Sequence, residues 1–192
     1  RDCVRWWREW SETCAYDGPF ATAVTRSLLV LKSLQFTLSG AVIAAASTSL
    51  PESIGGTRNW DYRFCWLRDA AFTLRAFADT GNGAAAAAFF DWLLHATRLT
   101  QPRLQALYDV HGRTDLDERS LEHLSGYRGS RPVRVGNGAH DQLQLDVYGM
   151  VVAAAENIVD HGLDLDPAER RLLVKLGHTV CALWRQPDNG IW

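Results

Sequence analysis

The sequence predicts an all-α fold of about five main helices, joined by long loops and containing little strand. Apolar residues recur every three or four positions over several long stretches, as they do on a helix with one buried face. Alanine, a strong helix former, is frequent. Hydrophobic residues make up 47% and charged residues 22% of the 192 residues, which is typical of a globular protein and excludes a disordered tail.

The N-terminal part is expected to hold one short element and one long helix. Residues 1–16 carry three tryptophans among charges, which indicates a short amphipathic helix or a packed linker. Helical spacing of apolar residues predicts a long helix within residues 18–39, and Gly40 ends it. Residues 41–57 contain a proline and a Gly-Gly pair, so we expect extended chain and turns there.

The middle of the chain predicts two helices followed by a long loop. The helices are expected over residues 66–80 and 84–99, with a Gly-Asn-Gly turn between them. Residues 103–136 are rich in Gly, Arg and Asp and predict an irregular loop, with one short strand at Leu104–Val110. A loop of this length in a compact domain is usually functional.

Two further helices are predicted in the C-terminal part. A long one is expected over residues 138–161. The next begins at the capping residue Asp166, has Pro167 at its first position and runs to Trp184. The helical stretches share no fixed sequence period, so a solenoid of identical repeats is not expected.

Charge and hydropathy exclude two kinds of partner. The chain carries 20 Lys and Arg against 22 Asp and Glu, a formal net charge of −2, so it lacks the basic face that nucleic acid requires. Its longest apolar run, Ala84–Phe90, is far shorter than the ~20 residues of a membrane-spanning helix. We therefore expect neither nucleic acid nor a membrane as a partner.

The cysteines and the missing motifs limit the chemistry further. The four cysteines show neither a CxxC pair nor metal-ligand spacing, and are interpreted as reduced, buried thiols of a cytoplasmic protein. Motifs of nucleotide sites, zinc proteases and serine hydrolases are absent, and no cofactor is expected. The chain starts at Arg1 without an initiator methionine, so we expect it to belong to a longer protein.

Residues 55–69, at the entry to a predicted helix, hold the densest group of functional side chains. Trp60, Tyr62 and Trp66 stand among three arginines and two aspartates. Sugars expose hydroxyl groups on their edges and C–H groups on their faces, so their sites combine carboxylates and guanidinium groups with flat aromatic rings. The group therefore indicates a carbohydrate site, although the same aromatics could pack in a core and Arg68 and Asp69 could form a surface ion pair.

A longer pattern favours the carbohydrate site. Residues 58–74 (RNWDYRFCWLRDAAFTL) resemble the signature of glycoside hydrolase family 15, the group of glucoamylases, glucodextranases and bacterial trehalases. Similar blocks cover residues 40–56, 107–149 and 184–192, the second most clearly at 126–137 and 141–149, so that almost the whole chain is included. The resemblance implies a toroid of six helical hairpins, (α/α)6. Residues 17–192 would be its N-terminal half, residues 1–16 a preceding linker or short helix, and the C-terminal half would be missing.

The resemblance also implies which residues bind substrate. Arg68 and Asp69 match a pair that binds hydroxyl groups of the glucose at the non-reducing end. Because the two residues are neighbours, the positive charge of Arg68 is expected to favour the ionised form of Asp69. Tyr62 and Trp66 match aromatic residues of the same subsite. Ile191 and Trp192 match the two residues before the general acid of the family. The roles of Asn137, Gln142 and Asp146, in a second matching block, are not assigned.

The reaction that the resemblance implies is inverting hydrolysis of an α-glucoside. One carboxylic acid protonates the glycosidic oxygen while a second carboxylate activates water. The family's general acid follows the position of Trp192 and its general base lies further on, so this chain has no assigned catalytic residue and is expected to be inactive alone. A catalytically inactive carbohydrate-binding relative stays open as an alternative, and so does a helical scaffold without a ligand. The sequence does not separate trehalose from starch-type oligosaccharides.

Overall fold

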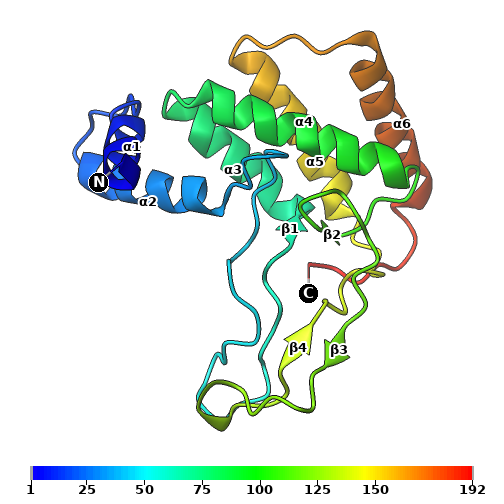
Figure 1. Cartoon of the computed structure of the whole chain (residues 1–192). Helices are drawn as coiled ribbons and strands as arrows, with labels where there is room; N and C mark the ends of the chain where they lie inside the picture. Colours follow the sequence, from blue (N-terminus) through cyan, green and yellow to red (C-terminus); the bar gives the residue numbers. More distant parts are fainter. Residues whose placement is uncertain (1, 192) are drawn as a thin grey trace.

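The computed structural model describes residues 2–191, which contain six α-helices (Figure 1). Two short antiparallel strand pairs and one 3₁₀ turn, η1 (Tyr127–Gly129), complete the secondary structure of this part of the chain. The strands are β1 (Cys65–Trp66) with β2 (Leu107–Tyr108), and β3 (Arg119–Ser120) with β4 (Arg134–Val135). The helices are α1 (Asp2–Ser11), α2 (Ala21–Leu34), α3 (Leu67–Asp79), α4 (Gly83–Thr100), α5 (Asp146–Asp160) and α6 (Pro167–Leu183).

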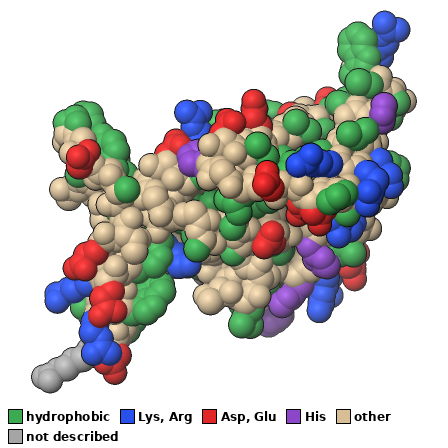
Figure 2. Space-filling view, turned by 90° about the horizontal axis from the view of Figure 1, so that it is seen from above, with side chains coloured by type: hydrophobic (Ala, Val, Ile, Leu, Met, Phe, Trp, Pro, Cys, Tyr) green, Lys and Arg blue, Asp and Glu red, His purple; other side chains and the backbone are tan. Residues whose placement is uncertain are grey.

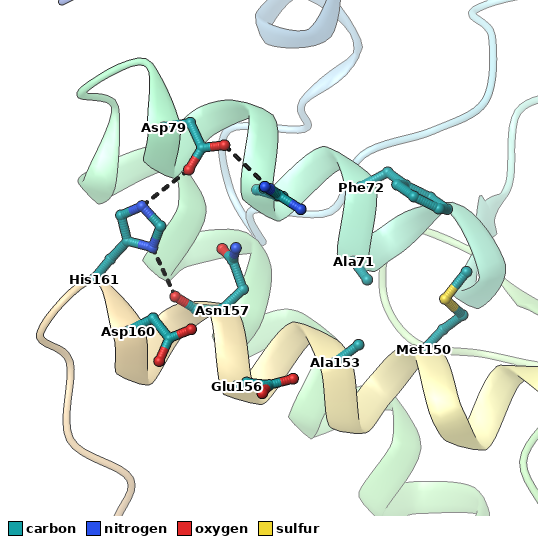
Figure 3. A pocket seen from close by; sticks show the side chains of 10 residues that line it. Ala71, Phe72, Asp79, Met150, Ala153, Glu156, Asn157, Asp160 and His161 are labelled. Carbon is teal, nitrogen blue, oxygen red and sulfur yellow. Dashed lines mark hydrogen bonds and ion pairs between the residues drawn. The ribbon is translucent and has the colours of Figure 1, made fainter.

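Helices α3 and α5 lie side by side and run in the same direction. At one end, Arg68 in the first turn of α3 donates to Gln144, just before α5, over 3.5 Å. At the other end, Nε2 of His161, just after α5, lies 3.1 Å from the carboxylate of Asp79, the last residue of α3. Figure 3 shows this second end, where the His161 ring also contacts the backbone oxygen of Asn157. The N-terminal ends of both helices therefore meet at the same edge of the molecule.

The hydrophobic core lies where α3, α4 and α5 pack together. Each of these helices buries a stripe of apolar side chains at three- and four-residue spacing. Short turns reverse the chain between α3 and α4 and between α5 and α6, so the body contains two helical hairpins. Large buried core side chains include Leu67, Leu74, Phe77, Phe89, Leu93, Tyr148 and Ile158.

An arm projects from the helical body and carries β3 and β4 (Figure 1). We define the arm as residues 46–62 and 116–137. Its first segment runs out and back as antiparallel chain, and the backbone N–H of Ser49 donates to the carbonyl oxygen of Trp60 over 2.9 Å. Much of the predicted irregular loop at 103–136 therefore belongs to the arm.

Two charged residues hold the arm together. The carboxylate of Asp61 is completely buried and accepts from the guanidinium of Arg63 at 2.7 and 2.9 Å. The guanidinium of Arg134 lies 3.0 Å from the carboxylate of Glu118, and the backbone N–H of Arg134 donates to the hydroxyl of Ser49 over 2.6 Å. An unpaired buried charge is costly, so these contacts favour one arrangement of the arm over others.

The predicted all-α architecture is confirmed, with two differences of extent. The helix expected over residues 138–161 begins only at Asp146, because the backbone N–H groups of Leu143 and Leu145 donate to the side chains of Asn189 and Asp188 instead of to helical carbonyl groups. The strand expected at 104–110 has two residues, paired with β1. The division of the chain between residues 16 and 17 stays a prediction.

The expectation of four buried thiols was wrong for two of them. Cys3 and Cys181 are exposed, since α1 buries none of its residues and the outer face of α6 meets solvent. Cys14 is partly buried and Cys65 is buried, and burial raises the pKa of the Cys65 thiol well above its ordinary value.

The surface mixes hydrophobic and charged side chains, as Figure 2 shows for one face. Phe20, Leu38 and Phe72 are 70%, 87% and 69% exposed. Within residues 2–191, no helix is both long and apolar enough to cross a membrane.

Candidate substrate-binding site

A cavity of about 590 Å³ lies between the arm and the N-terminal ends of α3 and α5. This volume is within the range of about 300–1,000 Å³ that small-molecule sites occupy. The lining comes from four places: the arm, β1 at the start of α3, the segment before α5 and the C-terminal segment. It combines aromatic rings and amide groups, among them Trp60, Tyr62, Trp66, Asn137, Gln142 and Ile191.

The extended backbone of the arm orients the rings of Trp60 and Tyr62 toward the cavity. Successive side chains of extended chain point to opposite sides. Asp61 points into the arm, where it is buried, whereas its neighbours Trp60 and Tyr62 line the cavity. Hydrogen bonds between the two antiparallel segments, such as that from the Tyr62 N–H to the oxygen of Ser47, fix this alternation.

Trp66 forms the wall of the cavity at the start of α3, and Arg68 packs against it. Trp66 belongs to β1 and immediately precedes the helix, so its ring is placed by both elements. The guanidinium of Arg68 lies 5.2 Å from the centroid of the Trp66 ring. Its Nη1 donates to the backbone oxygen of Ile191 over 2.6 Å and to Gln144 over 3.5 Å. Arg68 thereby joins α3 to the C-terminal segment at the edge of the cavity.

Asp69 lines a second, smaller hollow of about 210 Å³ between α2 and α3. Successive residues of a helix point about 100° apart, so Arg68 and Asp69 diverge. The two hollows share Trp66, which lines both. Among the other residues of the smaller hollow are the apolar side chains Leu31 and Phe89.

Arg68 was expected to lower the pKa of Asp69 and so to favour its ionised form. The net shift of this pKa has the opposite direction. The residue as a whole is exposed, yet its carboxylate borders an apolar hollow. This burial raises the pKa of Asp69, and the nearby Arg68 charge, which lowers the pKa, offsets only part of the effect.

The structure thus brings most of the predicted residues together. Tyr62, Trp66 and Ile191 line the large cavity. Arg68 contacts three of its lining residues, while Asp69 lies in the neighbouring hollow. Trp192 lies outside the described residues. Of the unassigned residues, Asn137 and Gln142 line the cavity.

Of the lining that the arm contributes, the sequence assigns only Tyr62 to the site. Trp60 also lines the cavity, and the alternation Arg58, Trp60, Tyr62 is a signal for one shared face. Glu52 and Glu118 also line the cavity, and nothing local in the sequence indicates this.

Both acidic side chains of the cavity wall already have partners. Glu52 lies 2.9 Å from the guanidinium of Arg58, and Glu118 lies 3.0 Å from that of Arg134. Within residues 2–191, no three His, Cys, Asp or Glu side chains come close enough to hold a metal ion together. The cavity therefore offers hydrogen-bonding groups and ring faces, with its carboxylates engaged.

Comparisons with known proteins place the chain in a family. The model of the family "Glycosyl hydrolases family 15" matches residues 18–192. The chain is 39% identical to a trehalase of Thermoplasma volcanium over 193 residues, covering 100% of this chain and 30% of that relative. It is 38% identical to a trehalase of Mycobacterium tuberculosis, covering 97% of this chain and 28% of the relative.

A solved structure supports the fold. A wild-type glycosidase matches with a TM-score of 0.59 and 21% identity, covering 85% of this chain and 41% of that one. The chain spans about a third of the length of the curated relatives it matches. Because the family model matches nearly all of the sequence, the chain belongs to glycosyl hydrolase family 15.

Proposed function

We propose that this chain forms part of a glycoside hydrolase that acts on the non-reducing terminal glucose of α-glucosides. The role of this chain in the reaction is to bind that glucose. Trehalose is the first candidate substrate, because the relatives above are trehalases. Starch-type oligosaccharides are the second, since they present the same terminal glucose.

The observation that carries the proposal is the combination of ring faces and hydrogen-bonding groups around one cavity. Tyr62 and Trp66 offer flat surfaces to the C–H faces of a sugar. The amide of Gln142 lines the cavity and can donate to and accept from sugar hydroxyl groups, while the buried Gln144 donates to it over 2.9 Å and helps to hold it in place. A neutral ligand with a polar edge and apolar faces suits this lining.

The proposed reaction also needs two carboxyl groups, ~6.5–9.5 Å apart in an inverting enzyme. Glu52 and Glu118 are poor candidates for the general acid, because each is already engaged in an ion pair with an arginine. We propose that both catalytic groups come from polypeptide outside residues 1–192. The chain alone should therefore bind sugar without hydrolysing it.

The first test titrates the chain with methyl α-glucoside and follows binding by saturation-transfer NMR. Methyl α-galactoside is the control, because it differs in the orientation of one hydroxyl group. Saturable binding of the glucoside with weaker binding of the galactoside supports the proposal. No saturable binding of the glucoside contradicts it, and release of glucose from trehalose by the chain alone contradicts the origin of the catalytic groups.

The second test assays the longer protein that contains this chain on trehalose and on maltooligosaccharides. Hydrolysis of either one supports the substrate class, and the ratio of the two kcat/KM values decides between them. Binding without hydrolysis would favour the alternative, a catalytically inactive carbohydrate-binding relative. The observation that favours this alternative is that the carboxylates lining the cavity are engaged in ion pairs.

We also propose a cytoplasmic location. Its support is that all four cysteines are free thiols, the state that a reducing compartment maintains. Fractionation of the source cells tests it, and recovery of the protein outside the cytoplasm would contradict it.

A further inference from the structure

We propose that Asp188 and Asn189 are positioning residues of the cavity. They hold residues 188–191, which we call the terminal strap, against the start of α5, so that Ile191 forms one wall. The inference rests on the proposed function, because it takes the cavity as the place of the sugar. It assigns a part in ligand affinity to two side chains that do not themselves line the cavity.

Burial of apolar surface contributes little to the position of the terminal strap. All residues from 184 to 191 are exposed, and Ile191 is 52% exposed although it lines the cavity. The strap follows the end of α6 at Leu183, and its four residues belong to no helix or strand. Its position therefore depends on hydrogen bonds.

Three hydrogen bonds attach the strap to the segment before α5. The carboxylate of Asp188 accepts from the backbone N–H of Leu145 over 2.9 Å, and the side-chain oxygen of Asn189 accepts from that of Leu143 over 3.0 Å. The backbone N–H of Asn189 donates to the carbonyl oxygen of Leu143 over 2.8 Å. The two bonds between Asn189 and Leu143 run in opposite directions, so they fix the orientation of the strap as well as its distance.

The bond from Leu145 to Asp188 also stabilises the start of α5. In a capping box, the third residue of a helix is a glutamate or glutamine whose side chain accepts from the backbone N–H of the residue before the helix. The third residue of α5 is Tyr148, so the helix has no such partner of its own. Asp188 supplies the bond from a position 43 residues further along the chain. The strap and the first turn of α5 are therefore stabilised together.

The other end of the strap is held at α3. The carboxylate of Asp188 accepts from the N–H of Gly190 over 3.2 Å, which closes a tight turn in which Gly190 has a φ of +62°. Ile191 follows directly. Its backbone oxygen accepts from Nη1 of Arg68 over 2.6 Å, and the residue lines the cavity. The strap thus connects the start of α5 with the start of α3 at the rim of the cavity.

Docking of the strap and occupation of the cavity should favour each other. A ligand that contacts the Ile191 wall binds the docked arrangement, so its apparent affinity falls with the fraction of chains in which the strap is docked. By the same linkage, the bound ligand must stabilise the docked strap. The bonds of Asp188 and Asn189 are exposed, so each contributes modestly, and the loss of both should have the larger effect.

The competing explanation is that these bonds only stabilise the fold. Glu169 provides a matched control, because its carboxylate accepts from the backbone N–H of Asp166, the residue before α6, over 2.7 Å. This bond has the same form as that between Asp188 and Leu145, but Glu169 does not line the cavity or belong to the strap. A purely structural bond would change stability in both places and ligand affinity in neither.

The first experiment measures dissociation constants for methyl α-glucoside with four variants of the chain: Asp188→Ala, Asp188→Asn, Asp188→Ala combined with Asn189→Ala, and Glu169→Ala. Asp188→Ala should weaken binding up to about fivefold and the double substitution up to about 25-fold, the ratios for the loss of one and of two independent caps. Asp188→Asn keeps an acceptor oxygen and should retain most of the affinity. Glu169→Ala should leave it unchanged. Circular dichroism confirms that each variant is folded.

The second experiment needs no substitution and therefore does not depend on the folding of a variant. It follows hydrogen exchange of single backbone N–H groups in the unchanged chain by NMR. Saturating methyl α-glucoside should slow exchange at Leu143 and Leu145, which donate to the strap. Exchange at Asp166, which donates to Glu169, should stay the same.

The outcomes separate this inference from the proposed function. Weaker glucoside binding in the double variant, with slower exchange at Leu143 and Leu145 when the glucoside is added to the unchanged chain, supports both. Glucoside affinity that the double substitution leaves unchanged, exchange that the glucoside leaves unchanged, or an equal loss of affinity in Glu169→Ala overturns the positioning role and leaves the proposed function standing. No saturable binding of the glucoside to the unchanged chain overturns the proposed function and this inference with it.

Discussion

Replacing Asp69 by asparagine separates sugar binding from folding. The substitution keeps the size of the side chain and removes its charge. Burial beside Leu31 and Phe89 raises the pKa of Asp69, so the folded protein disfavours the charged form. Ionisation of Asp69 therefore costs stability as the pH rises above the ordinary value of 3.8, and a neutral asparagine avoids that cost.

The expected effects on stability and binding have opposite signs. At pH 7 Asp69→Asn should be at least as stable as the unchanged chain. A hydrogen bond to a charged group contributes about 1.5–3 kcal/mol, so loss of the carboxylate should weaken glucoside binding about 10- to 150-fold. The assays are chemical denaturation and NMR titration with methyl α-glucoside, both at pH 7.

Asp79→Asn is the matched control, with the same substitution at the other end of α3. Asp79 contacts His161, as Figure 3 shows, and Arg75, and it does not line the cavity, so its replacement should lower stability slightly and leave binding unchanged. Unchanged glucoside affinity in Asp69→Asn would refute the assignment of Asp69 to the site. A loss of stability larger than that of Asp79→Asn would refute the account of its pKa.

Three further predictions concern stability and reactivity. Tyr148→Phe should cost about 1–3 kcal/mol in chemical denaturation, because the Tyr148 hydroxyl accepts from the buried N–H of Leu104 over 3.0 Å; an unchanged midpoint would contradict this. Asp166→Ala should lower the thermal midpoint at pH 7, because its carboxylate caps α6 by accepting from two backbone N–H groups. These bonds lower the pKa of Asp166, so its stabilisation should fade as the pH falls below 3.8, and an unchanged difference between the two melting points at low pH would contradict this. A thiol reagent should label the two exposed cysteines quickly and Cys65 only on unfolding, and rapid labelling of Cys65 in the folded chain would contradict its burial.

Much of the fold could be predicted because the helices are specified locally. The capping box at Asp166 and Glu169, with Pro167 between them, forms as the sequence indicates. The start of α5 could not be predicted in this way. Its position depends on side chains of Asp188 and Asn189, more than forty residues further along the chain, and no local pattern contains that competition.

The candidate site likewise contains residues that local sequence predicts and residues that it does not. Tyr62, Trp66 and Arg68 lie in one short stretch whose residue types already indicate a carbohydrate ligand. Glu118 reaches the cavity from a distant part of the chain, through pairing within the arm, and the sequence gives no sign of it. The raised pKa of Asp69 could not be predicted either, because it depends on apolar side chains of α2 and α4 that only the fold brings near.

The shared direction of α3 and α5 places two helix N-termini at the rim of the cavity and two C-termini at the opposite rim. Each helix carries a partial positive charge at its first turn and a partial negative charge at its last. Two such dipoles aligned side by side add, so oxygen-rich ligands gain a favourable potential at the rim beside Arg68 and Gln144. At the opposite rim the two C-terminal ends carry partial negative charge, and the His161 ring lies there between the Asp79 carboxylate and the Asn157 carbonyl. The orientation of two helices thus distinguishes the two rims before any individual contact is counted.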